Sequence, residues 1–310
     1  RPVLWTVVIF LICHFVIIHG VRGGIEKASK VMMPLLFILL LIIVVASCLL
    51  PDAGKGVEFL LKPDFGKVDR NVFLNALGQS FYSMSIGMGC ICTYASYFSR
   101  QTNLFKSALQ ISVIDLMVAV LAGLMIFPAA FSVGISPDSG PSLIFITLPN
   151  VFNKAFAALP VLGWIISLLF YVLLSVAALT SLMSLHEVNT SFFYEELKID
   201  RKKGAWIVTI SCAVIGAFCS FSLGATDKLS WFGKTLFDWF DFITGQIFLP
   251  MAGLLTCLFL GWYVPKKILK DEFTNWGTLK GRLFGIYFFL IRFVCPILIL
   301  LVFLNQFDVL

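Results

Sequence analysis

Residues Met32 to Leu50 read MMPLLFILLLIIVVASCLL, an apolar run without a single charged residue. A run of about 20 apolar residues is long enough to cross the hydrocarbon core of a bilayer as an α-helix. It lacks the alternation of apolar and polar residues that marks a strand of a membrane barrel. Because only helices and closed barrels satisfy their backbone groups in a bilayer, we predict a membrane-spanning helix here.

The rest of the chain has the same character. Hydrophobic residues make up 59% of its 310 residues and charged residues 13%, whereas about a quarter of a soluble domain is charged. We therefore predict an all-α polytopic membrane protein, a single transmembrane domain over residues 1–310 with eight transmembrane helices. Besides Met32–Leu50 the predicted segments are Leu4–Gly20, Val72–Phe98, Ser107–Phe131, Val161–Phe193, Ala205–Leu223, Leu236–Trp262 and Leu283–Leu304.

Loop charge orients these segments. Alternate loops, beginning with the one that holds Arg22, Lys27 and Lys30, carry most of the basic residues, and such loops are typically cytoplasmic. Both ends of the chain then face outward, which predicts an odd number of helices before Arg1. The net charge of +6 follows from this topology, so we expect no nucleic-acid partner.

Polar residues interrupt one apolar segment near its middle. Ser83 and Ser85 are followed by Gly87 and Gly89, and each glycine weakens a helix by about 1 kcal/mol relative to alanine. We predict that the helix unwinds here, which would free carbonyl groups for a cation and direct the N-terminus of the second half-helix at an anion. Close helix packing through small residues is the alternative interpretation.

Two further segments carry polar groups at membrane depth, where such groups are costly and often functional. Asp115 is predicted to be a buried carboxylate that binds a cation or a proton, or else an acid at the interface. Ala177, Thr180 and Ser181 share one helix face, and their oxygens suit a small hard cation. The alternative is that the hydroxyls bond to their own helix.

Other polar residues have simpler interpretations. We expect His14 and His19 to be structural, and His186 to form a polar pair with Glu187 or a proton relay. Arg292 is expected to pair with a carboxylate or to snorkel. The stretch Gly140–Pro160, broken by Pro149, predicts a helical hairpin on the outer surface.

Six strings resemble the neurotransmitter:sodium symporter family, whose members have the LeuT fold. They are GIEKASKVMMPLLF (24–37), FLLKPDF (59–65), ALGQSFYSMSIGMGCICTYASY (76–97), FITLP (145–149), and ALTS (178–181) with EELKIDR (195–201). The resemblance covers essentially the whole chain, as the family's fourth to eleventh helices, and implies three preceding helices. It also implies the end of one inverted repeat in 1–70, a second repeat in 71–263, and a cytoplasmic loop and last helix in 264–310.

The resemblance implies roles for individual residues, which fall into three sets. Substrate-binding residues would be Tyr82, Ser83, Ser85, Met88, Ser181 and Leu185. Sodium ligands would be Ser83, Asp115, Ala177, Thr180 and Ser181. Gate residues would be Asp241 on the outside and Tyr97, Glu187 and Glu195 on the inside.

Two departures from the family pattern refine the expected function. Ala119 stands where chloride-dependent members have a serine, and Asp115 adds a negative charge, so we expect Na⁺ coupling without chloride. Met88 with Tyr82 and Leu185 indicates a pocket for a hydrophobic or aromatic amino acid.

The resemblance thus implies a sodium-coupled amino-acid symporter in the cell's inner (plasma) membrane. A proton-coupled transporter, acting through Asp115 or His186, and a non-transporting receptor or scaffold are the alternatives. Neither an HExxH nor a GxSxG motif occurs, so we do not expect an enzyme. The sequence does not predict an oligomeric state.

Overall fold

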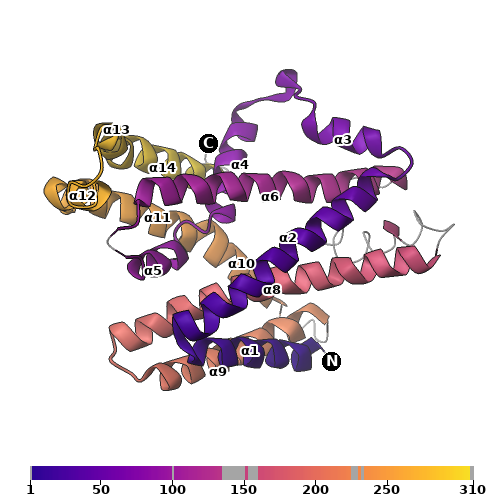
Figure 1. Cartoon of the computed structure of the whole chain (residues 1–310), viewed down its shortest axis with the longest axis horizontal. Coiled ribbons are helices and arrows are strands. Elements are labelled where there is room, and N and C mark those ends of the chain that lie inside the picture. Colours follow the sequence, from indigo (N-terminus) through magenta and orange to yellow (C-terminus); the bar gives the residue numbers. More distant parts are fainter. Residues whose placement is uncertain are drawn as a thin grey trace. The chain divides into compact units, whose positions relative to one another are not determined.

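The computed structural model describes residues 2–99, 101–134, 151–152, 160–224, 230–231 and 234–307. These residues are largely helical, as predicted (Figure 1). They form two compact units, one of Arg1–Ile18, Lys67–Ser112 and Ser184–Leu310, the other of His19–Gly66 and Val113–Met183. The long helices α6 (Leu104–Ser132) and α8 (Pro160–Glu195) contribute to both units.

Six described helices are long and apolar enough to cross a membrane. Two of the eight predicted segments do not meet this criterion within the described residues. Helix α1 (Pro2–Ile18) has 17 residues, and the predicted segment Val72–Phe98 is divided between two shorter helices. The six are Gly23–Cys48, Leu104–Ser132, Pro160–Glu195, Arg201–Ser222, Leu236–Tyr263 and Phe284–Gln306.

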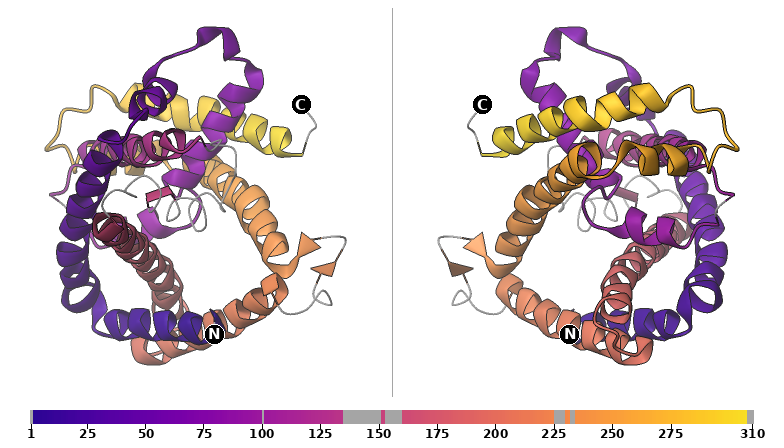
Figure 2. Two further views of the ribbon diagram at one scale, coloured as in Figure 1. Left: turned by 90° about the vertical axis from the view of Figure 1, so that its right-hand side faces the viewer. Right: turned by 90° about the vertical axis from the view of Figure 1, so that its left-hand side faces the viewer.

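In the first unit, α1 packs along α9 (Arg201–Gly224) (Figure 1). A short antiparallel hairpin of β1 (Ser230–Trp231) and β2 (Lys234–Thr235) precedes α10 (Leu236–Asp241) (Figure 2). Thr235 and Asp238 cap α10 reciprocally, since the Thr235 hydroxyl accepts from the Asp238 N–H and the Asp238 carboxylate accepts from the Thr235 N–H. The hairpin therefore ends where a well-capped helix begins.

The next two spans are helices interrupted by wider π-helical turns, which often occur at functional sites. The first span continues from α10 through η5 (Phe242–Phe248) and α11 (Leu249–Leu258) to η6 (Phe259–Tyr263). After α12 (Lys266–Phe273), the last span consists of α13 (Phe284–Phe289), η7 (Leu290–Val294) and α14 (Cys295–Gln306). Helix α11 packs on both α14 and α4 (Arg70–Ser83).

The second unit has its core between three helices. Leu40 and Ile43 of α2 (Glu26–Cys48), which follows the π-turn η1 (Val21–Ile25), are buried with Phe170 of α8 and Ala129 of α6. Between membrane helices such contacts stabilise through van der Waals packing, because lipid tails are as apolar as these side chains. These aliphatic and aromatic contacts hold the second unit together.

The connection after α2 includes α3 (Ala53–Leu61) and a short 3₁₀ turn, η2 (Phe65–Lys67). Gly56 lies directly on the backbone of α6, because a Cβ atom there would be 2.5 Å from the carbonyl carbon of Phe127 and the nitrogen of Pro128. The Phe59 ring packs on the ring of Phe127 at 5.1 Å. Glycine thus permits α3 to pack on the end of α6. The predicted hairpin at Gly140–Pro160 lies outside the described residues, except for 151–152 and Pro160.

Candidate functional site

The predicted break in the segment Val72–Phe98 is confirmed. Helix α4 ends at Ser83, and six residues separate it from α5 (Cys90–Ser96). Ser85, Gly87 and Gly89 have positive φ angles of 52°, 88° and 80°, in the left-handed region that glycine tolerates best. The helix therefore breaks where the sequence gathers its serines and glycines.

The end of α4 has the geometry of a Schellman cap. The Ile86 N–H donates to the Phe81 carbonyl at 3.0 Å, and the Ser85 N–H donates to the Tyr82 carbonyl at 3.1 Å. Ser85 occupies the left-handed position where glycine is usual, and a residue with a side chain is less stable there by about 1–2 kcal/mol. The backbone is thus held in a costly conformation at a predicted substrate residue.

The break leaves several carbonyl oxygens without a backbone hydrogen bond. Within the described residues, no backbone hydrogen bond ends on the carbonyl oxygens of Ile86, Gly87 or Met88. Carbonyl groups in a broken membrane helix are suitable ligands for a small cation or an ammonium group. Helix α5 has only seven residues, so we assign no anion site to its N-terminus.

Two glycines let the break pack tightly against neighbouring helices. A Cβ atom on Gly87 would collide with the carbonyl oxygen of Leu249, at the start of α11. A Cβ atom on Gly89 would be 3.2 Å from Cγ1 of Val188 in α8. The close approach at Gly87 is to rigid backbone, so this position requires glycine both for space and for its φ angle.

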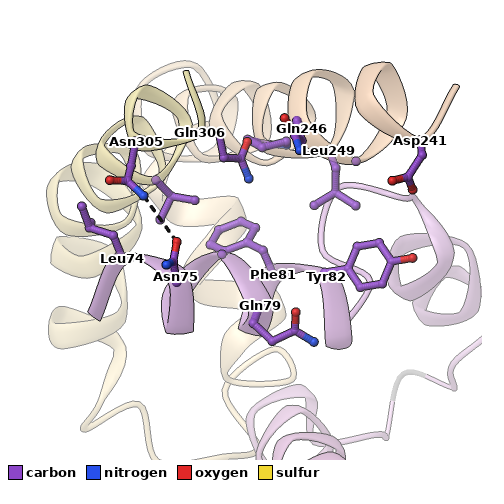
Figure 3. A pocket seen from close by; sticks show the side chains of 14 residues that line it. Leu74, Asn75, Gln79, Phe81, Tyr82, Asp241, Gln246, Leu249, Asn305 and Gln306 are labelled. Atoms are coloured by element: carbon purple, nitrogen blue, oxygen red, sulfur yellow. Dashed lines mark hydrogen bonds between the residues drawn. The ribbon is translucent and has the colours of Figure 1, made fainter. Parts of the chain in front are cut away.

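A cavity of about 360 Å³ lies between α4, the η5–α11 region and α14 (Figure 3). Tyr82 and Asp241, two of the predicted site residues, line it. Asn75 and Asn305 face each other, and the Asn305 amide donates a long hydrogen bond of 3.4 Å to the Asn75 side-chain oxygen. The cavity therefore has an acid, a phenol and several amides in its wall.

The amides of the cavity were missed by the sequence analysis. Five side-chain amides line it: Asn75, Gln79, Gln246, Asn305 and Gln306. The Oε1 atom of Gln306 is buried and has no hydrogen-bond partner in the part of the chain that the structure describes, which is costly unless a ligand or water supplies one. The sequence feature that could have indicated this cavity is the presence of amide side chains within apolar segments, because such groups require partners in a membrane.

The predicted sodium-binding face lies on α8. The Thr180 hydroxyl donates to the Ala177 carbonyl at 2.8 Å, so a bond to the helix itself does form, as the alternative interpretation expected. Ala177 and Thr180 are half-buried and Ser181 is exposed. These three residues and Asp115 belong to the second unit, whereas Ser83 belongs to the first, and their common role remains a prediction.

Two predicted inner-gate residues meet in the first unit. The Tyr97 hydroxyl donates to Oε1 of Glu187 at 3.0 Å. Arg201 forms a two-pronged ion pair with the same carboxylate, through Nη1 to Oε1 at 3.0 Å and Nη2 to Oε2 at 2.5 Å. Glu187 is fully buried, and this fork-shaped pairing is the strongest arrangement available to a carboxylate. Glu195 is exposed and does not join the cluster.

Arg201 is a site residue to which the sequence analysis assigned no role, although it ends the string EELKIDR. Its Nε and Nη2 atoms also donate to the Ile17 carbonyl of α1, at 3.3 and 3.2 Å. The guanidinium therefore joins α1, α8 and α9 at one point. The signal was Glu187 itself, because a carboxylate within an apolar segment requires a basic partner.

Two buried histidines lie close to this cluster. Nδ1 of His14 and Nε2 of His186 each lie 2.9 Å from Oγ1 of Thr209. Nδ1 of His186 lies 3.1 Å from the Thr190 hydroxyl. The described side-chain partners of both histidines are threonines, so the expected pairing of His186 with Glu187 is not found among the described residues.

With this geometry described, the chain can be compared with known proteins. A sequence model of the sodium:neurotransmitter symporter family matches residues 2–309. The chain belongs to this family. Membership makes it an integral, multi-pass membrane protein of a transporter family, consistent with its six long apolar helices.

Individual relatives agree with this assignment. The uncharacterized sodium-dependent transporter YhdH of Bacillus subtilis is 38% identical over 296 residues, which is 95% of this chain and 64% of YhdH. The sodium-dependent nutrient amino acid transporter 1 of Drosophila persimilis is 28% identical over 228 residues, 70% of this chain and 32% of its own. The chain thus spans less than two thirds of the length of either relative.

The crystal structure of MhsT in complex with L-phenylalanine is similar to the structure of this chain. It is similar with a TM-score of 0.85 and 35% sequence identity, over 98% of this chain and 68% of the MhsT chain. The LeuT-type helical fold expected from the resemblance is therefore confirmed.

Proposed function

We propose that the protein is a sodium-coupled symporter of hydrophobic or aromatic amino acids that works by alternating access in the plasma membrane. The observation that carries this proposal is the break between α4 and α5, with its hydroxyl groups and its unused carbonyl oxygens. Ions and substrate would complete each other's coordination there. Each should therefore raise the affinity for the other by the same factor.

We assign two sodium ions to oxygen ligands. Ser83 and Asp115 would bind the first ion, and Ala177, Thr180 and Ser181 would bind the second. The second assignment rests on one helix face that carries the Ala177 carbonyl and the hydroxyls of Thr180 and Ser181, because such hard oxygen ligands suit a small cation.

The substrate would contact Tyr82, Ser85, Met88 and Leu185, together with Ser83 and Ser181. The mixture of phenol, thioether and aliphatic groups favours an apolar side chain. Support comes from MhsT, whose structure contains L-phenylalanine, and from the Drosophila relative, a nutrient amino acid transporter by name.

Gates on the two sides would expose the site alternately. Asp241, at the wall of the cavity, would serve the outer gate. Tyr97 and Glu187 would serve the inner gate with Glu195, and their hydrogen bond supports the pairing of the first two.

Uptake by the full-length transporter in liposomes tests the proposal. Labelled leucine, tyrosine or tryptophan should accumulate when a sodium gradient is present and not when choline replaces sodium. The double variant Thr180→Ala/Ser181→Ala should lose sodium activation while its selectivity among substrates stays the same. Unchanged sodium activation in that variant would refute the second ion site, and better competition by glycine or glutamate than by leucine would refute the apolar pocket.

A proton-coupled transporter of the same fold is the second candidate. The buried pair of His14 and His186, which share the Thr209 hydroxyl, is the observation that favours it, because an imidazole can take up and release a proton. Uptake driven by a pH gradient in the absence of sodium would establish this candidate in place of the first.

A further inference from the structure

Two cations share one aromatic ring where the last two spans meet. The Arg292 guanidinium lies 5.7 Å from the centre of the Phe288 ring, and the Lys266 ammonium lies 5.0 Å from it. Arg292 also stacks on Trp262 at 4.3 Å. Each contact is an attractive cation–π interaction of about 0.5–2 kcal/mol, and together they bring two like charges into one neighbourhood.

The local backbone holds Arg292 in this place. The Trp262 indole N–H donates to the Arg292 carbonyl at 3.3 Å. A Cβ atom on Gly261 would be only 2.9 Å from Cα of Arg292, so the π-turns η6 and η7 pack directly on each other. Arg292 therefore has little freedom to move away.

These two charges are not neutralised within the described residues. None of the ion pairs there includes Arg292 or Lys266, and Nε of Arg292 is buried without a hydrogen-bond partner. The connection 264–283 holds five basic residues and two acidic ones. A partly buried guanidinium without an anion is unfavourable at membrane depth, so a negative group beside it would be stabilising.

The neighbouring residues indicate how deep the Arg292 guanidinium lies in the membrane. Trp262 and Tyr263 end an apolar span and are 59% and 80% exposed, as expected for aromatic residues at a membrane–water interface. Arg292 lies eight positions into its own span, about 12 Å along a helix. A long side chain at this depth reaches back toward the level of lipid head groups.

We propose that Arg292 and Lys266 bind the phosphate of an anionic phospholipid, with Trp262 and Phe288 forming the walls of the site. The guanidinium would donate hydrogen bonds to phosphate oxygens from its Nη groups, and the ammonium would supply a second charge. Basic pockets at the ends of membrane helices are suited to such head groups. The exposed aromatic surface beside the cations fits the glycerol and upper acyl chains of a lipid and offers nothing to a free phosphate ion.

Lipid binding to the purified protein in detergent tests this site. Native mass spectrometry would measure the binding of phosphatidylglycerol and phosphatidylcholine. Wild-type protein should prefer phosphatidylglycerol, and Lys266→Gln or Arg292→Gln should each weaken that preference about fivefold. The matched control is Lys267→Gln, which removes the same charge from the next exposed position of α12 and should change the preference far less.

Several outcomes would overturn the proposal. Equal binding of the two lipids to wild-type protein would refute an anion site. If Lys267→Gln weakened the preference for phosphatidylglycerol as much as Lys266→Gln, the lipid would be attracted by the general positive charge of this region and not by a defined site. If inorganic phosphate raised the thermal midpoint as much as phosphatidylglycerol, the site would bind a free ion and not a lipid. Lys266 is exposed, so its variant tests the site even if Arg292→Gln does not fold.

Discussion

Glu187 has the most demanding environment of the described gate residues. It is fully buried, and three hydrogen bonds from Tyr97 and Arg201 end on its two oxygens. A buried ion pair adds little net stability relative to apolar residues of similar size, but removing one partner leaves a charge without compensation. Removing only one partner of this pair should therefore cost more stability than replacing both.

We predict that Arg201→Gln destabilises the protein by about 3–5 kcal/mol, because it leaves the Glu187 carboxylate buried and unpaired. Adding Glu187→Gln to this variant should recover part of the loss, since an amide in place of the carboxylate carries no charge. Thermal unfolding in detergent measures both effects, with Lys203→Gln as the control for the loss of one basic charge from the same turn of α9. Strictly additive effects of the two substitutions would contradict the pairing.

Glycines at the break lead to a graded prediction. Gly87→Ala should destabilise the protein by about 2–4 kcal/mol, since it combines a left-handed backbone with a collision against the backbone of α11. Gly89→Ala should cost less, because only the Val188 side chain has to move. Gly285→Ala, with open space around it and no positive φ angle, should be neutral or stabilising. Thermal midpoints that do not follow this order would contradict the described packing of the break.

At the scale of elements, α3 offers a matched pair of glycines. Gly56→Ala should detach α3 from α6, because the added Cβ atom would lie 2.5 Å from the α6 backbone. Gly54→Ala, on the same short helix with nothing within 4 Å, should stabilise it by up to about 1 kcal/mol. Proteolysis of the connection around α3 would measure the difference. Equal protection of the two variants would show that α3 does not depend on this contact.

The elements also show what the sequence could and could not predict. The break was predictable because its cause is local, as serines and glycines at 83–89 favour non-helical backbone wherever they lie. The ion pair of Glu187 with Arg201 was not, since the two residues meet only through folding and the Ile17 carbonyl that Arg201 also contacts lies 184 residues away. The amide-lined cavity was missed for the same reason, because three separate helices supply its wall.

At the scale of the whole molecule, the orientation of the loops was inferred from their charge and stays a prediction, whereas apolar length predicted the class of protein. It could not predict how each segment is divided, because hydropathy averages over a window and does not register the dihedral angles of Ser85, Gly87 and Gly89. The expected eight spans therefore correspond to six long helices in the described residues. One shorter helix and one broken segment account for the other two.

Ion coupling is also a property of the whole transporter. If Asp115 supplies the negative charge that chloride brings in other members of the family, uptake should persist when chloride is replaced by gluconate. Asp115→Asn should then lower uptake in gluconate far more than in chloride, because only chloride could replace the missing charge. Loss of wild-type uptake in gluconate would contradict the role of Asp115.

The break between α4 and α5 has a mechanical consequence. An unbroken helix transmits torque along its length, because its ladder of hydrogen bonds resists bending. Here the ladder stops at Ser83 and resumes at Cys90, and the glycines between them can absorb rotation with little energy cost. Helix α4 packs on α14 where Gly78 lies against Val302, and we expect α5, which ends beside Tyr97, to be able to turn independently of α4.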